Sequence, residues 1–120
     1  MVTIESATDL ALLMPAILNS NTTSRLFDCR TFSFSKKSVA QEMIRLGQGR
    51  KMIDGHAFPD IGGAGVRLYE IKKDNHLEYT VVEFEKGLML EVFTFDNLED
   101  AIAKKIEVWT VSYEMKFSEN

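Results

Sequence analysis

Three apolar-alternating segments joined by two short polar turns constrain the fold of this chain more than any other feature. The segments span Val66–Lys73, Leu77–Glu85 and Leu88–Phe95, and all are rich in β-branched and aromatic residues. This composition is typical of β-strands. Asp74-Asn75 and Lys86-Gly87 suit two-residue turns, because Asp, Asn and Gly tolerate positive φ. The stretch therefore predicts an antiparallel three-stranded meander.

Counting outward from the two turns predicts the register of this meander. Leu68 is expected opposite Val81, and Val81 opposite Val92 of the third segment. The same count pairs Lys72 with Leu77, Glu70 with Tyr79, Val66 with Glu83, Glu83 with Leu90 and Tyr79 with Thr94. Opposed residues of an antiparallel ladder share a face. We therefore expect a core face that carries Val66, Leu68, Leu77, Tyr79, Val81, Leu88, Leu90 and Val92.

The other face of the predicted sheet mixes polar and apolar side chains. Its polar members are Arg67, Lys73, Glu78, Thr80 and Glu91, and its apolar members are Tyr69, Ile71, Val82, Phe84, Met89, Phe93 and Phe95. A sheet face in contact with water is normally polar. Two explanations stay open, a covering layer from the same chain and a partner or second subunit, since large exposed apolar patches indicate association.

Helix signals occur on both sides of the meander. Ser6-x-x-Asp9 resembles a capping box and precedes apolar residues at helical spacing up to Leu18. Pro15 cannot donate a backbone hydrogen bond, so we expect this helix to kink or restart near Met14. Ser35 or Ser38 is expected to cap a second helix that reaches about Leu46, with Gly47 as its stop. Asp96 or Asn97 is expected to cap a third helix.

Two more strands complete the predicted order. Leu26–Ser35 is a candidate strand, and from Val108 the apolar period changes to two, which predicts a final strand to about Phe117. The order is therefore α-β-α-loop-β-β-β-α-β. The length suits one domain, so residues 1–120 are interpreted as a single α+β domain.

Charge and cysteine content narrow the functional class. The net charge is −4, and residues 66–120 hold seven basic and twelve acidic side chains, a net charge of −5. An acidic half disfavours nucleic acid and favours a basic partner. The lone Cys29 is interpreted as a small core residue, and it predicts a reducing, cytoplasmic location. The longest uncharged run, Leu10–Ser24, is too short and too polar to span a bilayer. Glu5 and Asp9, with no Lys or Arg before Arg25, argue against a secretory signal.

The Gly-rich loop 51–65 contains the only grouping that suggests chemistry. Asp54, His56 and Asp60 could converge, and His56 could act as a base, but the spacing lacks a regular element to hold three ligands. Gly62–Gly65 precedes a strand rather than a helix, unlike a phosphate loop. We therefore expect a structural loop, with no metal, no cofactor and no catalytic residue.

These observations favour a small cytoplasmic protein-binding or inhibitor protein, of the immunity-protein, antitoxin or phage-encoded inhibitor type. The expected partner is another protein with a basic surface, or a second copy of the chain. We expect acidic residues to orient this partner and aromatic residues of the mixed face to anchor it. The candidate partner-binding residues are Glu78, Glu83, Glu91, Tyr69, Phe84 and Phe93.

Two other functions compete with this interpretation. The first is a small-molecule-binding protein or an enzyme that uses the Gly-rich loop 54–65, with His56 as acid or base. The second is a ribonuclease, because the helix, the loop and the meander opening G-V-R-L-Y-E-I resemble RelE-type toxins. That resemblance implies basic side chains spread over the sheet. Here Arg67 is the only arginine among several glutamates, so the ribonuclease is the least favoured interpretation.

Overall fold

The computed structural model describes residues 4–18, 31–57, 65–111 and 116–118. The elements are α1 (Ala7–Leu18), β1 (Thr31–Ser35), α2 (Lys36–Arg45), the 3-10 helix η2 (Gly49–Met52), β2 (Gly65–Lys73), β3 (His76–Glu85), β4 (Leu88–Phe95), α3 (Leu98–Val111) and β5 (Lys116–Ser118). β2, β3 and β4 form an antiparallel sheet, and β1 pairs with β5 in a separate parallel pair. The predicted α+β class is confirmed.

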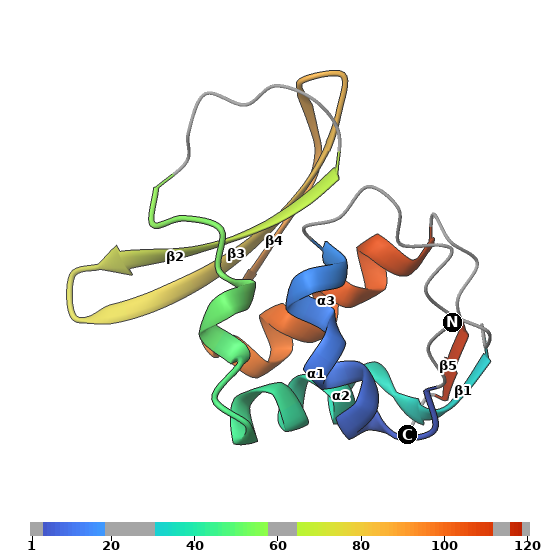
Figure 1. The fold of residues 1–120 in the computed structure, drawn as a ribbon. Helices are drawn as coiled ribbons and strands as arrows, with labels where there is room; N and C mark the ends of the chain where they lie inside the picture. The colour runs from blue at the N-terminus through green and yellow to red at the C-terminus, as the bar shows by residue number, and fades with distance from the viewer. Residues whose placement is uncertain (1–3, 19–30, 58–64, 112–115, 119–120) are drawn as a thin grey trace.

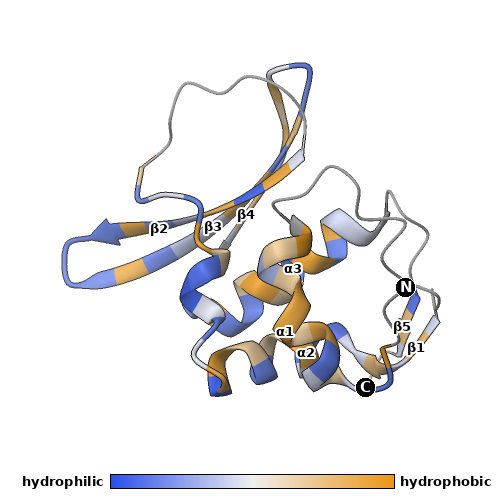
Figure 2. Ribbon diagram, viewed as in Figure 1, coloured by the Kyte–Doolittle hydropathy of each residue, from blue (hydrophilic) through white to orange (hydrophobic). Residues whose placement is uncertain are grey.

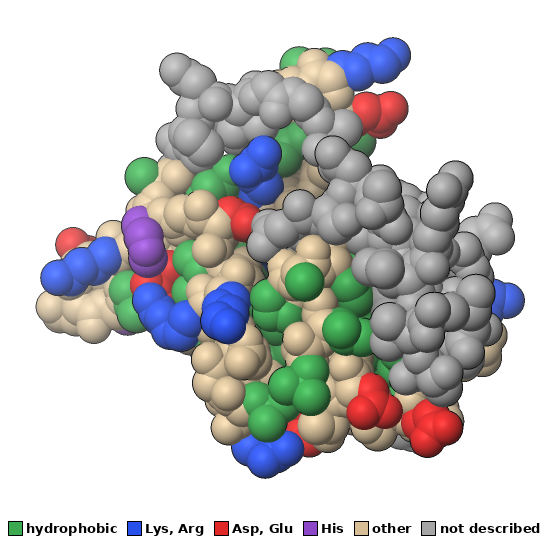
Figure 3. Space-filling model, in the orientation of Figure 1, with side chains coloured by type: hydrophobic (Ala, Val, Ile, Leu, Met, Phe, Trp, Pro, Cys, Tyr) green, Lys and Arg blue, Asp and Glu red, His purple; other side chains and the backbone are tan. Residues whose placement is uncertain are grey.

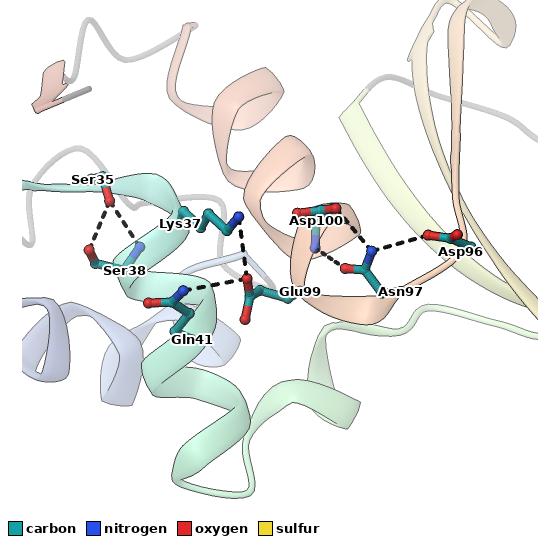
Figure 4. A network of polar contacts seen from close by, with 8 residues as sticks. All are labelled: Ser35, Lys37, Ser38, Gln41, Asp96, Asn97, Glu99 and Asp100. Atoms are coloured by element: carbon teal, nitrogen blue, oxygen red, sulfur yellow. Dashed lines mark hydrogen bonds and ion pairs between the residues drawn. The ribbon is translucent and has the colours of Figure 1, made fainter. Parts of the chain in front are cut away.

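The helices begin where the sequence places their caps. Ser6 Oγ accepts a bond from Asp9 N, and Asp9 Oδ2 accepts from Ser6 N, each at 3.2 Å. Ser35 Oγ accepts from Ser38 N at 3.0 Å at the start of α2, and Asn97 Oδ1 accepts from Asp100 N at 2.9 Å beside α3 (Figure 4). These bonds satisfy backbone N–H groups that a helix leaves without partners.

The helix α1 continues through Pro15 to Leu18, so of the kink or restart predicted near Met14, the restart does not occur. Proline removes one backbone donor. Leu10, Ala11, Met14 and Ile17 are nevertheless fully or almost fully buried on one side of α1. We attribute the continuity of the helix to this packing, because tertiary burial outweighs local propensity.

The two predicted turns and the first register are confirmed. Asp74 and Lys86 have φ values of 40° and 54°, and Gly87 has 80°. Leu68 pairs with Val81, and the ladder from Val66–Glu83 to Lys72–Leu77 is the predicted one. Short turns with residues that accept positive φ therefore determine this hairpin locally.

The register of β4 differs from the prediction by one residue. Val81 pairs with Phe93 rather than Val92, and Glu83 pairs with Glu91 rather than Leu90, because the ladder shifts between Glu83 and Phe84. A bulge of this kind adds one residue to a strand and exchanges the faces beyond it. Phe93 and Phe95 therefore pack against the core. Among the residues predicted to be buried, Leu77, Leu88, Leu90 and Val92 are 41%, 68%, 50% and 50% exposed.

The core lies between the helices and one face of the sheet. Figure 1 shows the three α-helices together on one side of β2–β4, and Figure 2 shows that each of these helices contains hydrophobic stretches. Leu68, Val81, Met43, Ile102 and Ile106 are fully buried there. A smaller cluster on the other face of the sheet contains Tyr69, Val82 and Phe84, with Ile71 beside it. The chain itself therefore covers part of the second face.

The final strand begins later than predicted, because α3 continues to Val111. Among the described residues after α3, Lys116–Ser118 is a strand, and residues 112–115 lie outside the described part of the chain. Thr110 is buried, and its hydroxyl donates to the Glu107 carbonyl at 3.1 Å, which satisfies the polar group within the helix. Trp109 packs against the core from the same helix. The strand predicted to begin at Val108 is therefore wrong over the last turn of α3.

Candidate functional site

The two edges of the three-stranded sheet differ in whether another segment is hydrogen-bonded to them. Along β2, Asp54 N donates to the Leu68 carbonyl at 2.7 Å, and Glu70 N donates to the Gly55 carbonyl at 2.9 Å. The segment after η2 therefore covers the middle of that edge. β4 is the other edge, and no described residue pairs with its outer side. Uncovered edge strands are templates for association with another chain.

Four large apolar side chains project into solvent from β4. Leu88, Met89, Leu90 and Val92 are 68%, 58%, 50% and 50% exposed. Met89 lies opposite Phe84, and Val92 lies opposite Val82, so both extend the buried cluster of the second face toward the edge. The bulge explains why Val92 is exposed, because the shifted register places Phe93 on the core face and Val92 on the opposite face. Apolar groups gathered in this way on one edge indicate a contact surface.

Acidic side chains lie on the other face of the same hairpin from Met89 and Val92. Glu83 and Glu91 are directly opposed across β3 and β4, and Glu85 is exposed at the same hairpin. Like charges at opposed positions repel. No cation among the described residues forms an ion pair with any of the three. We call Leu88, Met89, Leu90, Val92, Glu83, Glu85 and Glu91 together the β4 edge surface.

The predicted partner-binding residues are only partly on this surface. Glu83 and Glu91 belong to it, whereas Glu78 lies farther along β3, with an oxygen 3.5 Å from His76 Nε2. Tyr69 and Phe84 are 1% and 3% exposed within the second cluster, so neither side chain is available as a surface anchor. Phe93 is half-buried on the core face, with Lys104 Nζ 4.5 Å from its ring centroid. The aromatic anchors expected from the sequence are thus inside the domain.

The candidate loop residues have structural partners. Asp54 Oδ2 accepts bonds from Leu68 N at 2.7 Å and Lys105 Nζ at 2.8 Å. No group of three metal-ligating side chains is present among the described residues. Asp60, Gly62–Ala64 and Cys29 lie outside the described residues. The carboxylate of Asp54 is therefore occupied in holding the segment after η2 against β2 and α3.

A second polar cluster, which we call the Arg50 cluster, consists of Arg50, His56 and Glu70 where η2 meets β2. Glu70 is 7% exposed and accepts two bonds from Arg50, at 2.5 Å to Nη1 and 2.8 Å to Nη2. His56 Nδ1 lies 3.4 Å from the same carboxylate. Hydrogen bonding by Arg50, and to a smaller extent by Tyr79, lowers the pKa of Glu70 despite its burial, so it stays ionised. One buried carboxylate therefore joins an arginine and a histidine.

Sequence reasoning did not find the Arg50–Glu70 pair. The two residues are twenty positions apart, and no local pattern connects them. A signal nevertheless existed, because the predicted register places Glu70 opposite Tyr79 on the core face. A carboxylate at a core position needs a partner. Arg50 is the partner that Glu70 has in the structure.

The cavity between α2 and α3 was another possible ligand site. Its volume is about 530 Å³, and its charged lining consists of Lys36, Lys37, Lys104, Asp100 and Glu107. Lys36 and Lys104 both bond to Glu107, and Lys37 Nζ lies 3.8 Å from Glu99, as Figure 4 shows for the last pair. Because these cations already have partners, the cavity indicates a helix–helix seam more than a ligand site.

Comparisons with known proteins do not assign a function to this arrangement. No protein-family model, curated protein or solved structure matches the chain. Among the described residues, no helix combines the length and apolar character needed to cross a bilayer. The function must therefore be inferred from the chemistry of the β4 edge surface and of the Arg50 cluster.

Proposed function

We propose that this chain is a protein-binding protein of the inhibitor, immunity-protein or antitoxin type, and that it binds a basic protein partner at the β4 edge surface. The observation that carries the proposal is the exposure of four large apolar side chains on an edge strand whose outer side pairs with no described residue. Buried apolar anchors contribute most of the binding energy in protein interfaces. A cytoplasmic location belongs to the same proposal.

Charge specifies the partner. The span His76–Phe95 holds four glutamates and one lysine, a net charge of −3. The opposed Glu83 and Glu91 side chains gain most from a cation that sits between them, and Lys or Arg of a partner would supply it. A second copy of this chain would bring the same acidic pair, so charge favours a different, basic protein. Such charges mainly act on association rate and orientation.

The proposal is tested by affinity capture from the native host, with each captured protein then purified and measured in isolation. We expect a stoichiometric partner with a basic surface whose binding weakens as salt concentration rises. Leu90→Ser, Glu83→Lys and Glu91→Lys should each weaken it at least tenfold. Glu5→Lys, the same charge reversal at an exposed position before α1, is the matched control and should leave binding unchanged.

Two results would contradict this function. If the pure protein forms a stable dimer that Leu90→Ser disrupts, the surface is a self-association surface. If every captured protein binds the Glu91→Lys and Leu90→Ser variants as well as the original chain, the β4 edge surface is not the contact. Sizing chromatography of the variants, with circular dichroism to verify folding, separates these outcomes.

A further inference from the structure

The Arg50 cluster presents unused hydrogen-bond donors at the molecular surface. Arg50 and His56 side chains are 63% and 70% exposed, although both contact a Glu70 side chain that is 7% exposed. A guanidinium has five N–H donors, and Glu70 engages two of them. Because His56 turns Nδ1 toward Glu70, its Nε2 nitrogen lies on the ring's other side. A rigid carboxylate therefore holds an exposed guanidinium and an exposed imidazole side by side, and the imidazole donates from Nε2 when it is protonated.

Two further exposed cations, Lys51 and Lys72, belong to the same elements as Arg50 and Glu70. Lys51 follows Arg50 in η2 and is exposed. Lys72 is two residues beyond Glu70 on the same face of β2, about 7 Å along the strand, and is exposed as well. Figure 3 shows Lys and Arg side chains gathered near a histidine over η2 and the adjoining end of the sheet. With Glu70 counted, three cations and one carboxylate give a local charge of +2 on a chain whose net charge is −4.

We propose that Arg50, His56, Lys51 and Lys72 form a binding site for the phosphate group of a small phosphomonoester. A phosphate monoester carries about −1.5 to −2 charges at neutral pH, which matches the local charge of +2. Its oxygens can accept paired N–H bonds from one guanidinium, and charge-assisted bonds of this kind are the strong ones. A carboxylate ligand would neutralise only half of the site. This proposal is independent of the partner proposed at the opposite edge.

A purely structural role for the cluster explains less. The segment after η2 is already attached to β2 by the backbone bonds of Asp54 and Gly55. The Arg50–Glu70 pair strengthens this attachment. The attachment does not require a second, exposed side chain, His56, beside the same carboxylate. Glu70 instead gives both side chains a common orientation, so the site is pre-formed before a ligand arrives. Pre-organisation of this kind increases affinity because fewer side chains become ordered on binding.

The proposal is tested by NMR titration of the full chain with inorganic phosphate and methyl phosphate. Acetate at equal ionic strength is the singly charged control. We expect saturable shifts confined to the side-chain nitrogens of Arg50 and His56 and to neighbouring amides, with a dissociation constant on the order of a millimolar. Acetate should bind at least tenfold more weakly.

Variants determine whether the named residues are responsible. His56→Ala and Lys72→Ala replace exposed side chains, and each should weaken methyl phosphate binding at least fivefold. Lys37→Ala removes the same charge from an exposed position on α2 and is the matched control. Arg50→Gln should abolish binding, provided that its amide spectrum shows an intact fold. Equal shifts with acetate, or equal affinity in His56→Ala and Lys37→Ala, would show general charge screening and overturn the proposal.

Discussion

Lys105 is a buried cation of α3 that holds the end of η2 and the segment after it against this helix. Its side chain is 4% exposed, and Nζ donates to the Met52 carbonyl and to Asp54 Oδ2, both at 2.8 Å. Burial lowers its pKa, and the nearby Asp54 carboxylate opposes that effect. We therefore expect Lys105→Met, which keeps the length of the side chain but removes the charge, to destabilise the protein strongly.

The magnitude depends on the groups that lose their partner. Removing one member of a buried ion pair costs about 3–5 kcal/mol. Asp54 is 22% exposed and keeps its bond from Leu68 N, so the lower end of this range applies. The unsatisfied Met52 carbonyl contributes about 1 kcal/mol of that loss. We expect a decrease of about 3 kcal/mol in the free energy of unfolding, or about 10 °C in Tm for a domain of this size.

Urea unfolding at neutral pH measures this difference, with Lys104→Met as the matched control. Lys104 is the adjacent lysine of α3, but it is 26% exposed and pairs with Glu107, so its loss should change stability by less than about 1 kcal/mol. The double variant Lys105→Met/Asp54→Asn should recover part of the loss, because the asparagine carries no charge. Equal destabilisation by Lys105→Met and Lys104→Met would refute the reasoning.

The shifted register, the buried Glu70 and the engaged Asp54 each lead to a further prediction. Val81→Ala should lower the free energy of unfolding by about 2 kcal/mol, because the methyl groups of Val81 are fully buried. Val92→Ala, at a half-exposed position, should change it by no more than about 0.5 kcal/mol. Urea unfolding of both variants tests the shifted register, and equal losses of stability would contradict it. Because the pKa of Glu70 is lowered in the folded protein, its ionised carboxylate stabilises the fold at pH values above the usual pKa of 4.5. This contribution should disappear as the pH falls through the folded-state pKa. Glu70→Gln should therefore reduce the loss of stability in acid, as a pH series of thermal melts would show. Equilibrium dialysis against zinc should show no micromolar binding, since Asp54 is engaged by Lys105, and zinc binding lost in His56→Ala would contradict this.

Local chemistry in the sequence determined the helix starts and one hairpin. The caps at Ser6 and Ser35 depend on side chains within three residues of the backbone groups they satisfy. The β2–β3 register is determined in the same way by the turn at Asp74-Asn75 and the alternation beside it. Contacts of this range leave a pattern in a short stretch of sequence, which is why they could be predicted.

Tertiary structure decided the features on which the functional proposals depend. The bulge in β4 exchanges the faces of Val92 and Phe93, and no turn residue indicates it. The shifted register is favoured by the packing of Phe93 and Phe95 against the core, which forms only in the folded domain. The Arg50–Glu70 and Lys105–Asp54 pairs join residues 20 and 51 positions apart. The free energy of such pairs depends on the burial of both groups. Burial exists only after the helices and the sheet have packed together, so these partners could not be predicted from the sequence.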